Sequence, residues 1–583
     1  MELKKKRILI EWIALLSGIS LFLFGILYEY KTRYISTFFT NIIHYNPLHP
    51  DSFEFTLRGF KSVPSFLIGL FLVSFGLSRY GNEVFNKIKI KIEANFEKRI
   101  LLIILLLTFI ICIIINIYIL QSGAISIDET CYLIQANLFA RLKLWGEPPP
   151  PGHLTYMAVY TGINRMFGGH FLGHSIPLSI GILLGMDFLI PALLGSITCL
   201  MLFLFFKEVF GLKIATWATF LLFLSPFHIF ISSGYMSHCD HLLFLLLAFY
   251  LLELFLKRKR DINIFFSGFS IGFAFFIRPL ETLPIVFILM ILIIYKLRKK
   301  SIKPFLFFGL GGGIWLFVIF LTNYLFSGSI FITPMSMVSP WVTTRLIPFS
   351  LGWTFFKGIL QVYIYSILLS FDLFGWWGNS LIFIIIFMIF GRNRFENHWT
   401  KIFMLILMIA IVYQVIMQNN PITPYGARYF YAAIPLLILL TIKGIETAAK
   451  SVKKLGIPVY SFMGYIIIGF FLLSFAFYIP LKQHISRNII QSNAVKKGFP
   501  TREARNIVLN AKRPAVVLFT DMRALHALYY LNQKYPDLKL GLSSGLMKDL
   551  ELKSELPEYN VYYLKSLPDD TQILESPEWG ESR

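Results

Sequence analysis

An adjacent pair of acidic residues, Asp128 and Glu129, follows the long apolar run from Leu101 to Leu120. A run of this length can cross a bilayer as a helix, so both carboxylates are expected at a membrane surface. Ionised side chains cost roughly 2.5 to 3.5 kcal/mol at the bilayer centre and less at its edge, so such positions are functional-site hypotheses. A carboxylate here can deprotonate a hydroxyl or bind a cation. An adjacent pair of acids in an external loop can equally well be solvated surface without a catalytic role.

More polar residues stand at the ends of later apolar runs. They are His238, Asp240 and His241, then Arg278 and Glu281, then Arg428 within Tyr425-Gly-Ala-Arg-Tyr429. His238 and His241 lie three apart on one helical face, and Asp240 beside them raises a metal-site hypothesis. Histidines at helix ends are more often caps than metal ligands. All of these groups reach one membrane face if successive apolar runs alternate in direction.

The two arginines are candidates for binding a phosphate group. The guanidinium fork grips phosphate oxygens and keeps its charge. Arg278 precedes Pro279 and has the alternative role of a snorkelling anchor. Arg428 is predicted on the external side, against the positive-inside bias. A set of carboxylates, imidazoles and arginines at one face suits chemistry on a phosphate-bearing lipid, with a base for the acceptor hydroxyl and cations for the leaving phosphate.

The composition defines the class of protein. With 583 residues, 56% hydrophobic content and a mean hydropathy of +0.67, the chain is predicted to be a polytopic membrane protein. The net charge of +22 comes from Lys and Arg in short segments between apolar runs, which disfavours nucleic-acid binding. The four cysteines have neither metal-finger spacing nor disulfide-scaffold density, although Cys131 and Cys239 are predicted near the same face and could pair.

Alternation and charge bias together predict about 13 crossings. The basic start, Met1 to Arg7, is expected to stay in the cytoplasm before a retained anchor. Two apolar runs follow the second external loop, which is predicted to end near Phe355. Leu381 to Phe390 with its flanks is taken as the crossing, and Phe355 to Leu369 as interfacial or re-entrant. The predicted crossings are Ile8 to Leu27, Ser65 to Ser78, Leu101 to Leu120, Phe188 to Phe206, Ile214 to Ile231, His241 to Leu256, Ile264 to Ile277, Leu283 to Tyr295, Pro304 to Phe326, Leu381 to Phe390, Ile402 to Met417, Tyr429 to Ile442 and Ile457 to Ile479.

The predicted fold class is an all-α polytopic membrane protein with a small C-terminal extracytoplasmic α/β domain. An odd number of crossings leaves the tail outside the cytoplasm. In the tail, Ala515 to Phe519 reads as a strand and Asp521 to Leu531 as a helix, and a lid or acceptor-docking role is preferred for this module. The predicted domains are residues 1–99, a two-helix extension, 100–481, a catalytic domain with external loops 121–177 and 327–355, and 482–583, the soluble tail.

The order of these motifs resembles the GT-C superfamily of integral-membrane glycosyltransferases, particularly its aminoarabinose transferase, protein O-mannosyltransferase and Rgt-type branches. The matching residues are Ile127-Asp-Glu-Thr-Cys-Tyr132, the His238 to His241 helix start, Arg278-Pro279 and Gly426-Ala-Arg-Tyr429 with Pro435. The resemblance covers about Leu101 to Ile479. Cys131 departs from the more polar residue expected there, which leaves the sugar undefined.

The resemblance implies transfer of a hexose or pentose from a polyprenyl-phosphate donor to a lipid, glycan or protein acceptor. It implies the extracytoplasmic face of the plasma (inner) membrane, within the cell envelope. Asp128 is then the acceptor-activating or metal-binding residue, with Glu129 assisting. Arg428 and Arg278 are expected at the donor phosphate, and His238, Asp240, His241 and Tyr132 at the acceptor or a divalent metal cation. Membrane lipids are the remaining expected partners.

Other readings of the chain stay open. A transporter or flippase of lipid-linked saccharides predicts polar sites near the membrane midplane, where Asn323 and Gly311 to Gly313 are the places to look. An O-antigen ligase or polymerase relies on external Arg and His, so the acidic pair discriminates against it. Neither a Walker-type loop nor a Rossmann fingerprint occurs, so no nucleotide cofactor is expected. Gly311 to Gly313 reads as a helix-packing or kink feature.

Overall fold

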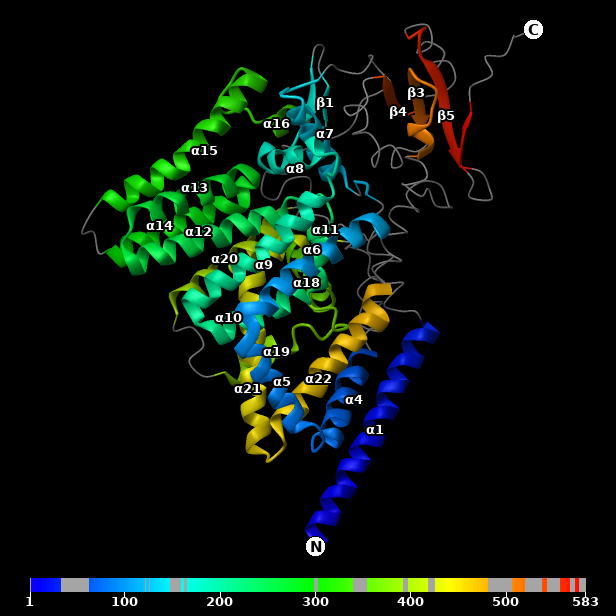
Figure 1. The fold of residues 1–583 in the computed structure, drawn as a ribbon, viewed down its shortest axis with the longest axis vertical. Coiled ribbons are helices and arrows are strands. Elements are labelled where there is room, and N and C mark those ends of the chain that lie inside the picture. The colour runs from blue at the N-terminus through cyan, green and yellow to red at the C-terminus, as the bar shows by residue number, and fades with distance from the viewer. Residues whose placement is uncertain are drawn as a thin grey trace. The chain divides into compact units, whose positions relative to one another are not determined.

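The computed structural model describes residues 2–32, 62–120, 122–124, 126–146, 159–161, 165–297, 302–338, 354–391, 397–417, 425–480, 506–519, 537–542, 556–566 and 572–575. Helices dominate, and two small sheets accompany them (Figure 1). The chain divides into two compact units. Unit 1 comprises residues 1–107, 199–229 and 352–485, and unit 2 comprises residues 108–198, 230–351 and 486–583. The predicted domain boundaries stay predictions.

The helices and strands have the following bounds. The helices are α1 (Glu2–Thr32), α4 (Ser62–Leu77), α5 (Asn82–Asn95), η1 (Phe96–Ile100), α6 (Leu101–Tyr118), α7 (Ile127–Ala140), η2 (Leu172–His174), α8 (Ser175–Leu183), α9 (Leu189–Phe210), α10 (Leu212–Phe223), α11 (Pro226–Ser233), α12 (His238–Arg258), α13 (Asp261–Ile277), α14 (Pro279–Leu297), α15 (Lys303–Ser327), α16 (Pro334–Val338), α18 (Phe355–Asp372), α19 (Ile382–Phe390), α20 (His398–Ile416), η3 (Arg428–Ala433), α21 (Ile434–Lys454), α22 (Val459–Leu473) and η4 (Ser474–Tyr478). The strands are β1 (Val159–Thr161), β2 (Met166–Gly168), β3 (Ala515–Phe519), β4 (Leu538–Leu542), β5 (Asn560–Ser566) and β6 (Gln572–Glu575).

Many of the helices are long and apolar enough to cross a bilayer. Among the described residues ten helices qualify by length and composition, and up to twelve spans result if each of two bent pairs counts as one. The bent pairs are Val63–Leu77 with Asn82–Asn95 and Leu212–Phe223 with Pro226–Ser233. The helix Asp261–Ile277 is apolar but slightly shorter. The prediction of an all-α integral membrane protein is therefore confirmed.

Of the two apolar runs between residues 355 and 390, the structure makes the first the better candidate for a span. Helix α18 is long and apolar enough to cross a bilayer, whereas α19, within the predicted crossing Leu381 to Phe390 and its flanks, has nine residues, or about 14 Å of helix against a hydrocarbon core of about 30 Å. The polar side chain of Gln361 lowers the apparent hydropathy of α18. That amide is buried and donates to the Gln414 amide oxygen of α20 at 2.6 Å, so its polarity is satisfied inside the protein. Which of the two runs crosses the membrane stays a prediction.

In unit 1, α1 and α4 run side by side because glycines let their backbones approach (Figure 1). A Cβ atom on Gly18 would lie 2.7 Å from the Gly69 carbonyl oxygen, and one on Gly69 would lie 2.9 Å from that of Gly18. Small residues at facing positions are the usual means of close packing between membrane helices. An ion pair of 2.8 Å between Glu11 and Arg79 joins the same two segments.

In unit 2, α13 packs between α12 and α15. Glycines again form the contact: a Cβ on Gly311 of α15 would collide with the Phe265 carbonyl oxygen of α13, and one on Gly272 of α13 would lie 2.9 Å from Gly312. Gly313 has open space around it. The helix-packing interpretation of Gly311 and Gly312 is thus confirmed, and Gly313 takes no part in the contact. This packing fixes the end of α13, from which Arg278 follows.

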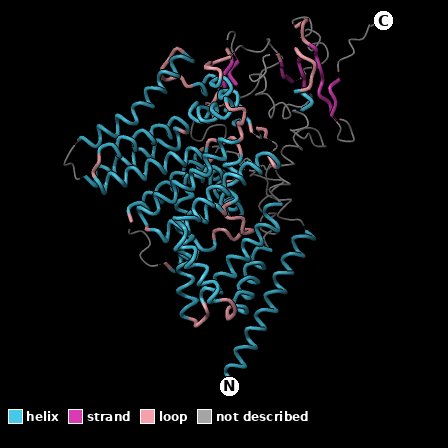
Figure 2. Tube along the Cα trace, in the orientation of Figure 1, coloured by secondary structure: helices cyan, strands magenta, loops and turns pink. Residues whose placement is uncertain are grey.

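The tail contains a four-stranded sheet in the order β4-β3-β5-β6 (Figure 2). Strand β3 pairs in parallel with β4 and β5, and β6 is antiparallel to β5. The predicted strand Ala515 to Phe519 is β3 itself. The predicted helix Asp521 to Leu531 lies outside the described residues. A separate antiparallel pair, β1 and β2, belongs to the loop before η2, with Val159 opposite Gly168.

Candidate active site

Helix α7 begins with a capping box that involves the second residue of the acidic pair. The Ser126 hydroxyl accepts the Glu129 backbone N–H at 3.3 Å, and the Glu129 carboxylate accepts the Ser126 N–H at 2.9 Å. The other carboxylate oxygen of Glu129 accepts the backbone N–H of Tyr235 at 2.8 Å. Glu129 is fully buried. Its carboxylate therefore fixes the start of α7 to the turn that precedes α12.

Asp128 lies in the same first turn but remains accessible. Its side chain is 29% exposed, and its Oδ1 lies 3.3 Å from Nε2 of His170, whose side chain is 20% exposed. The first turn of a helix suits an acidic side chain, because the helix dipole is positive there. Of the acidic pair, Asp128 is thus the accessible carboxylate, and Glu129 is the buried carboxylate that fixes the turn.

The segment that carries His170 packs so closely against α7 and α13 that two of its positions have room only for glycine. Gly168 donates its N–H to the Gln135 side chain of α7 at 3.2 Å, and a Cβ at Gly168 would collide with the Cys131 carbonyl oxygen. A Cβ at Gly173 would come within 2.9 Å of Ile277 and Phe276 at the end of α13. The two glycines therefore let the loop lie directly against α7 and α13.

His174 anchors the end of this segment to α12. Its Nδ1 lies 2.7 Å from Oδ2 of Asp240, and its Nε2 donates to the Tyr235 carbonyl oxygen at 2.9 Å. His174 and Asp240 are both buried. Both ring nitrogens of His174 therefore have an oxygen partner, a carboxylate at Nδ1 and a backbone carbonyl at Nε2. The turn at Tyr235 is thereby held by Glu129 on one side and by His174 on the other.

A second set of contacts connects α7 with α12 and α14. The Tyr132 hydroxyl lies 3.0 Å from the Ser237 hydroxyl, which accepts from Nη1 of Arg278 at 3.0 Å. Arg278 also donates through Nε and Nη2 to Oε1 of Glu281, the Nε bond being 2.8 Å long. The guanidinium of Arg278 is therefore already bound to a carboxylate and a hydroxyl.

His241 completes this network. Its Nδ1 lies 3.6 Å from Oε2 of Glu281, and its Nε2 lies 2.8 Å from the Thr282 hydroxyl oxygen. The Thr282 hydroxyl in turn donates to the Arg278 carbonyl oxygen at 2.8 Å. His241 is buried and has structural partners on both ring nitrogens.

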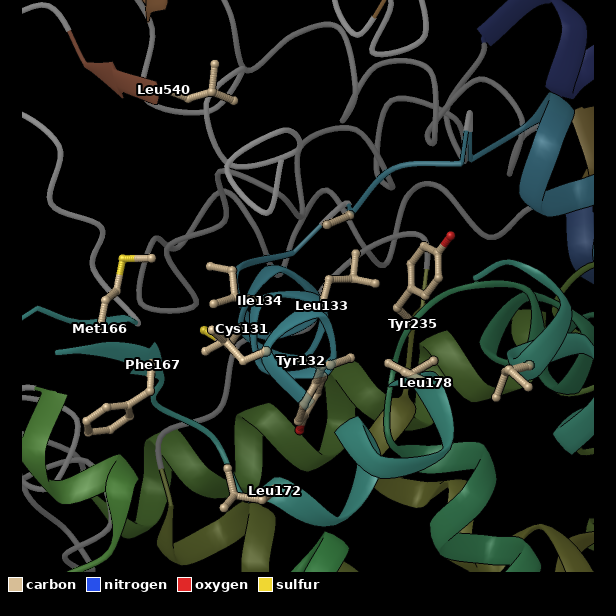
Figure 3. Packing of buried hydrophobic residues seen from close by; sticks show 14 of the residues in the cluster. Cys131, Tyr132, Leu133, Ile134, Met166, Phe167, Leu172, Leu178, Tyr235 and Leu540 are labelled. Carbon is tan, nitrogen blue, oxygen red and sulfur yellow. The ribbon is translucent and has the colours of Figure 1, made fainter. Parts of the chain in front are cut away.

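The hydrophobic side of α7 packs into a buried cluster. Figure 3 shows Met166 and Phe167 of β2 on the side of Cys131, with Leu178 and Tyr235 on the opposite side of the helix.

Burial raises the pKa of the Tyr132 hydroxyl well above its usual value, an effect that the Arg278 charge partly offsets. Burial likewise raises the pKa of the Cys131 thiol, and the Asp128 charge adds to it. Both groups therefore stay protonated at neutral pH.

The four cysteines are all buried thiols outside any disulfide, so the pairing considered for Cys131 and Cys239 does not form. Cys239 has its Sγ 3.2 Å from the Ser232 hydroxyl. Apolar filling, the usual role of a buried cysteine thiol, describes them well.

Arg428 belongs to unit 1, where it opens η3. Its residue exposure is 4%, its Nη2 donates to the Tyr429 hydroxyl at 3.2 Å, and its guanidinium lies 5.0 Å from the Tyr429 ring centroid. Gly426 precedes it with a positive φ of 56°, and a Cβ there would collide with the Asp372 carboxylate. Pro435 follows in the first turn of α21, where its missing N–H is not needed. Gly426 and Ala427 thus form the turn that leads into η3, and Arg428 and Tyr429 are the first two residues of η3.

Within unit 2, the predicted site residues of α7, of the α12 start and of the Arg278 segment join one contact network. The buried His238 lies in the first turn of α12 beside them. Sequence reasoning missed His170 and His174. The only available signal for the histidines was their four-residue spacing in Gly169-His-Phe-Leu-Gly-His174, at the end of the first external loop.

The candidate metal ligands have other partners. Among the described residues no group of three or more His, Cys, Asp or Glu side chains is arranged to hold a metal ion. The Asp240 carboxylate contacts His174, and His241 binds Thr282. These residues, as arranged here, do not fit a metal site.

Part of the chain matches a known protein family. Residues 187–325 match the model of the dolichyl-phosphate-mannose-protein mannosyltransferase family. This region contains α12, α13 and most of α15, including the His238 to His241 helix start and Arg278. No curated protein sequence matches the chain significantly.

Three solved structures are similar at low identity. ArnT from Cupriavidus metallidurans bound to undecaprenyl phosphate has 12% identity and a TM-score of 0.49, over 82% of this chain and 94% of that one. The Archaeoglobus fulgidus oligosaccharyltransferase AglB, in complex with an inhibitory peptide and a dolichol-phosphate, has 11% identity and a TM-score of 0.42, over 83% and 75%. The same organism's enzyme in complex with Zn and sulfate has 13% identity and a TM-score of 0.44, over 82% and 73%.

Because the TM-scores and sequence identities of these structures are low, the comparison of this chain with membrane glycosyltransferases depends on the family match. That match covers the part of the chain in which α12 and α13 position Asp240, His241 and Arg278. The match confirms the predicted resemblance of the chain to the membrane glycosyltransferases of the GT-C superfamily.

Proposed function

We propose that this protein transfers a sugar from a polyprenyl-phosphate donor to the hydroxyl of a lipid, glycan or protein acceptor on the extracytoplasmic face of the plasma membrane. The observation that carries the proposal is the accessible carboxylate of Asp128 at the N-terminus of α7, which Glu129 locks to the turn before α12. The family match over residues 187–325 supports the reaction class.

In this reaction Asp128 accepts the proton of the acceptor hydroxyl while that oxygen bonds to the anomeric carbon and the bond from that carbon to the donor phosphate breaks. The polyprenyl phosphate leaves with its negative charge, which arginine stabilises well. Arg428 and Arg278 stay the predicted phosphate ligands. Because Glu281 and Ser237 already bind the Arg278 guanidinium, we propose that Arg278 mainly positions Ser237 and Tyr132, and that Arg428 contributes more to donor affinity.

We propose that Asp128 is the point of contact for any divalent cation the enzyme uses, since it is the accessible carboxylate of the acidic pair. Asp240, His238 and His241 are then structural residues at the start of α12. Removal of bound cations with EDTA, followed by separate addition of Mg²⁺, Mn²⁺ and Zn²⁺, tests this. Restoration of activity by one cation in the intact protein, with weaker restoration in Asp128→Glu, supports the proposal.

The decisive experiment measures sugar transfer in reconstituted membranes from a panel of polyprenyl-phosphate sugars. The intact protein is compared with Asp128→Asn and with Asp187→Asn, a control in which the carboxylate accepts the N–H of the neighbouring Phe188 at 3.1 Å. We expect transfer by the intact protein and the control, and loss of at least about 100-fold in Asp128→Asn.

Other outcomes identify the alternatives. Transfer that survives Asp128→Asn points to a ligase-like site based on other residues. Movement of the lipid-linked sugar across the membrane without transfer points to a flippase.

A further inference from the structure

His170 is the side chain in contact with the accessible carboxylate of the site. Its Nε2 lies 3.3 Å from Oδ1 of Asp128, and its ring lies 5.3 Å from the ring of Tyr132, one turn further along α7. Neither motif matching nor the family match assigns it a role, because it precedes residues 187–325. The partial exposure of both partners means that their contact contributes little to stability.

The loop around His170 is fixed on both sides. Before it, Gly168 donates to Gln135, and the Gly169 backbone donates to the Cys131 thiol. After it, His174 contacts Asp240 and Tyr235. A short segment held at both ends by buried contacts gives the side chain between them a defined position. His170 is therefore placed against Asp128 by the fold and does not reach it by chance from a free loop.

We propose that His170 is a positioning residue for Asp128, an inference that depends on the proposed function of Asp128 as the base. The imidazole at Oδ1 holds the Asp128 carboxylate in the orientation in which it accepts the proton of the acceptor hydroxyl. Contacts of this kind tighten when substrate binds. A base that is displaced by about 1 Å loses roughly 100-fold in rate, because proton transfer depends on its distance to the hydroxyl.

Two amide variants of His170 separate the effect of positioning Asp128 from the effect of side-chain size. The glutamine amide nitrogen reaches about as far from the backbone as Nε2, whereas the asparagine nitrogen stops near the position of Nδ1. We expect His170→Asn to lower kcat roughly 10- to 100-fold with little change in the KM for donor, and His170→Gln to recover most of the rate. Thermal stability in detergent should be equal in both variants. His398→Asn in unit 1 is the matched control and should retain full kcat.

A double substitution tests whether His170 acts through Asp128. In an Asp128→Asn background, His170→Asn should cause no further loss, because the group that it positions is gone. Independent losses that multiply, or equal kcat in the Asn variant and the intact protein, overturn the inference while leaving the glycosyltransferase proposal intact. Equal losses in the Gln and Asn variants also overturn it. Absence of transfer by the intact protein with every donor overturns both proposals.

Discussion

The imidazole of His174 and the carboxylate of Asp240 lie 2.7 Å apart, and both are buried between the loop before η2 and the start of α12. Removing one partner of a buried pair leaves an uncompensated charge, which costs about 3 to 5 kcal/mol. We therefore expect Asp240→Asn and His174→Gln each to lower the thermal unfolding midpoint in detergent markedly. The double variant should lose less than the sum of the two single losses.

Lys213→Gln is the control for that experiment. Lys213 lies 3.9 Å from Glu446 and is 57% exposed, and such surface pairs contribute roughly 0 to 1 kcal/mol. A midpoint that falls as far in Lys213→Gln as in Asp240→Asn would contradict the structural importance of the His174 pair.

The capping box of α7 should matter for activity as well as for stability. In Glu129→Gln the side chain keeps one acceptor oxygen and carries an NH2 donor in place of the other, so either Ser126 or Tyr235 loses its acceptor at a cost of roughly 1 to 3 kcal/mol. Ser126→Ala should cost about 1 kcal/mol. Because Asp128 lies in the same turn, both variants should also lower kcat. Stability by thermal unfolding and initial rates of transfer measure the two effects.

Thr354 provides the comparison, since its hydroxyl caps α18 by accepting from the Lys357 N–H at 3.3 Å. Thr354→Ala should destabilise by a similar amount and leave kcat unchanged. If it lowers kcat as much as Ser126→Ala, the effect of the α7 cap on Asp128 is not specific.

The glycines of α15 should differ sharply in their tolerance of a methyl group. Gly311→Ala forces a Cβ into the backbone of α13 at Phe265, so we expect loss of folded protein or a strong fall in thermal stability. Gly313→Ala meets open space and should leave expression and stability unchanged or slightly improved, because alanine favours the helix by up to about 1 kcal/mol. Size-exclusion profiles of the two variants in one detergent provide the measurement. Equal behaviour would show that α13 and α15 are not in backbone contact.

The Cys131 thiol should be unreactive in the native protein at alkaline pH. Burial raises its pKa, and the thiolate is the form that reacts, so the native protein contains less thiolate at any given pH than the denatured chain. The stability contributed by the protonated thiol is fully present below the unfolded pKa and decreases as the pH rises through the higher native value.

Alkylation by iodoacetamide checks this in a variant whose other three cysteines are replaced by alanine. Labelling of the native protein should stay slow as the pH rises from about 7 to about 9, while labelling in denaturant should accelerate around the usual thiol pKa of about 8.5. Native labelling at the denatured rate would place Cys131 in solvent.

Much of the fold can be read from the sequence, because a bilayer requires long apolar helices and their hydropathy is local information. The strand Ala515 to Phe519 is predictable for the same reason, as a short run of apolar residues. The length and apolar character that make α18 a candidate span were harder to predict, because the polarity of Gln361 is satisfied by Gln414 of α20, a partner 53 residues away in the chain.

The sequence by itself determined that Asp128 and Glu129 lie together in the segment that follows an apolar run, which was predicted as an external loop. Only the structure showed that they begin helix α7 and that they differ: Glu129 turns inward to accept from Ser126 and Tyr235, while Asp128 stays accessible beside His170. Successive residues of a helix point in directions about 100° apart, so neighbours of one chemistry face different surroundings. Which side meets protein and which meets substrate depends on the elements that pack against α7, and those elements come from distant parts of the chain.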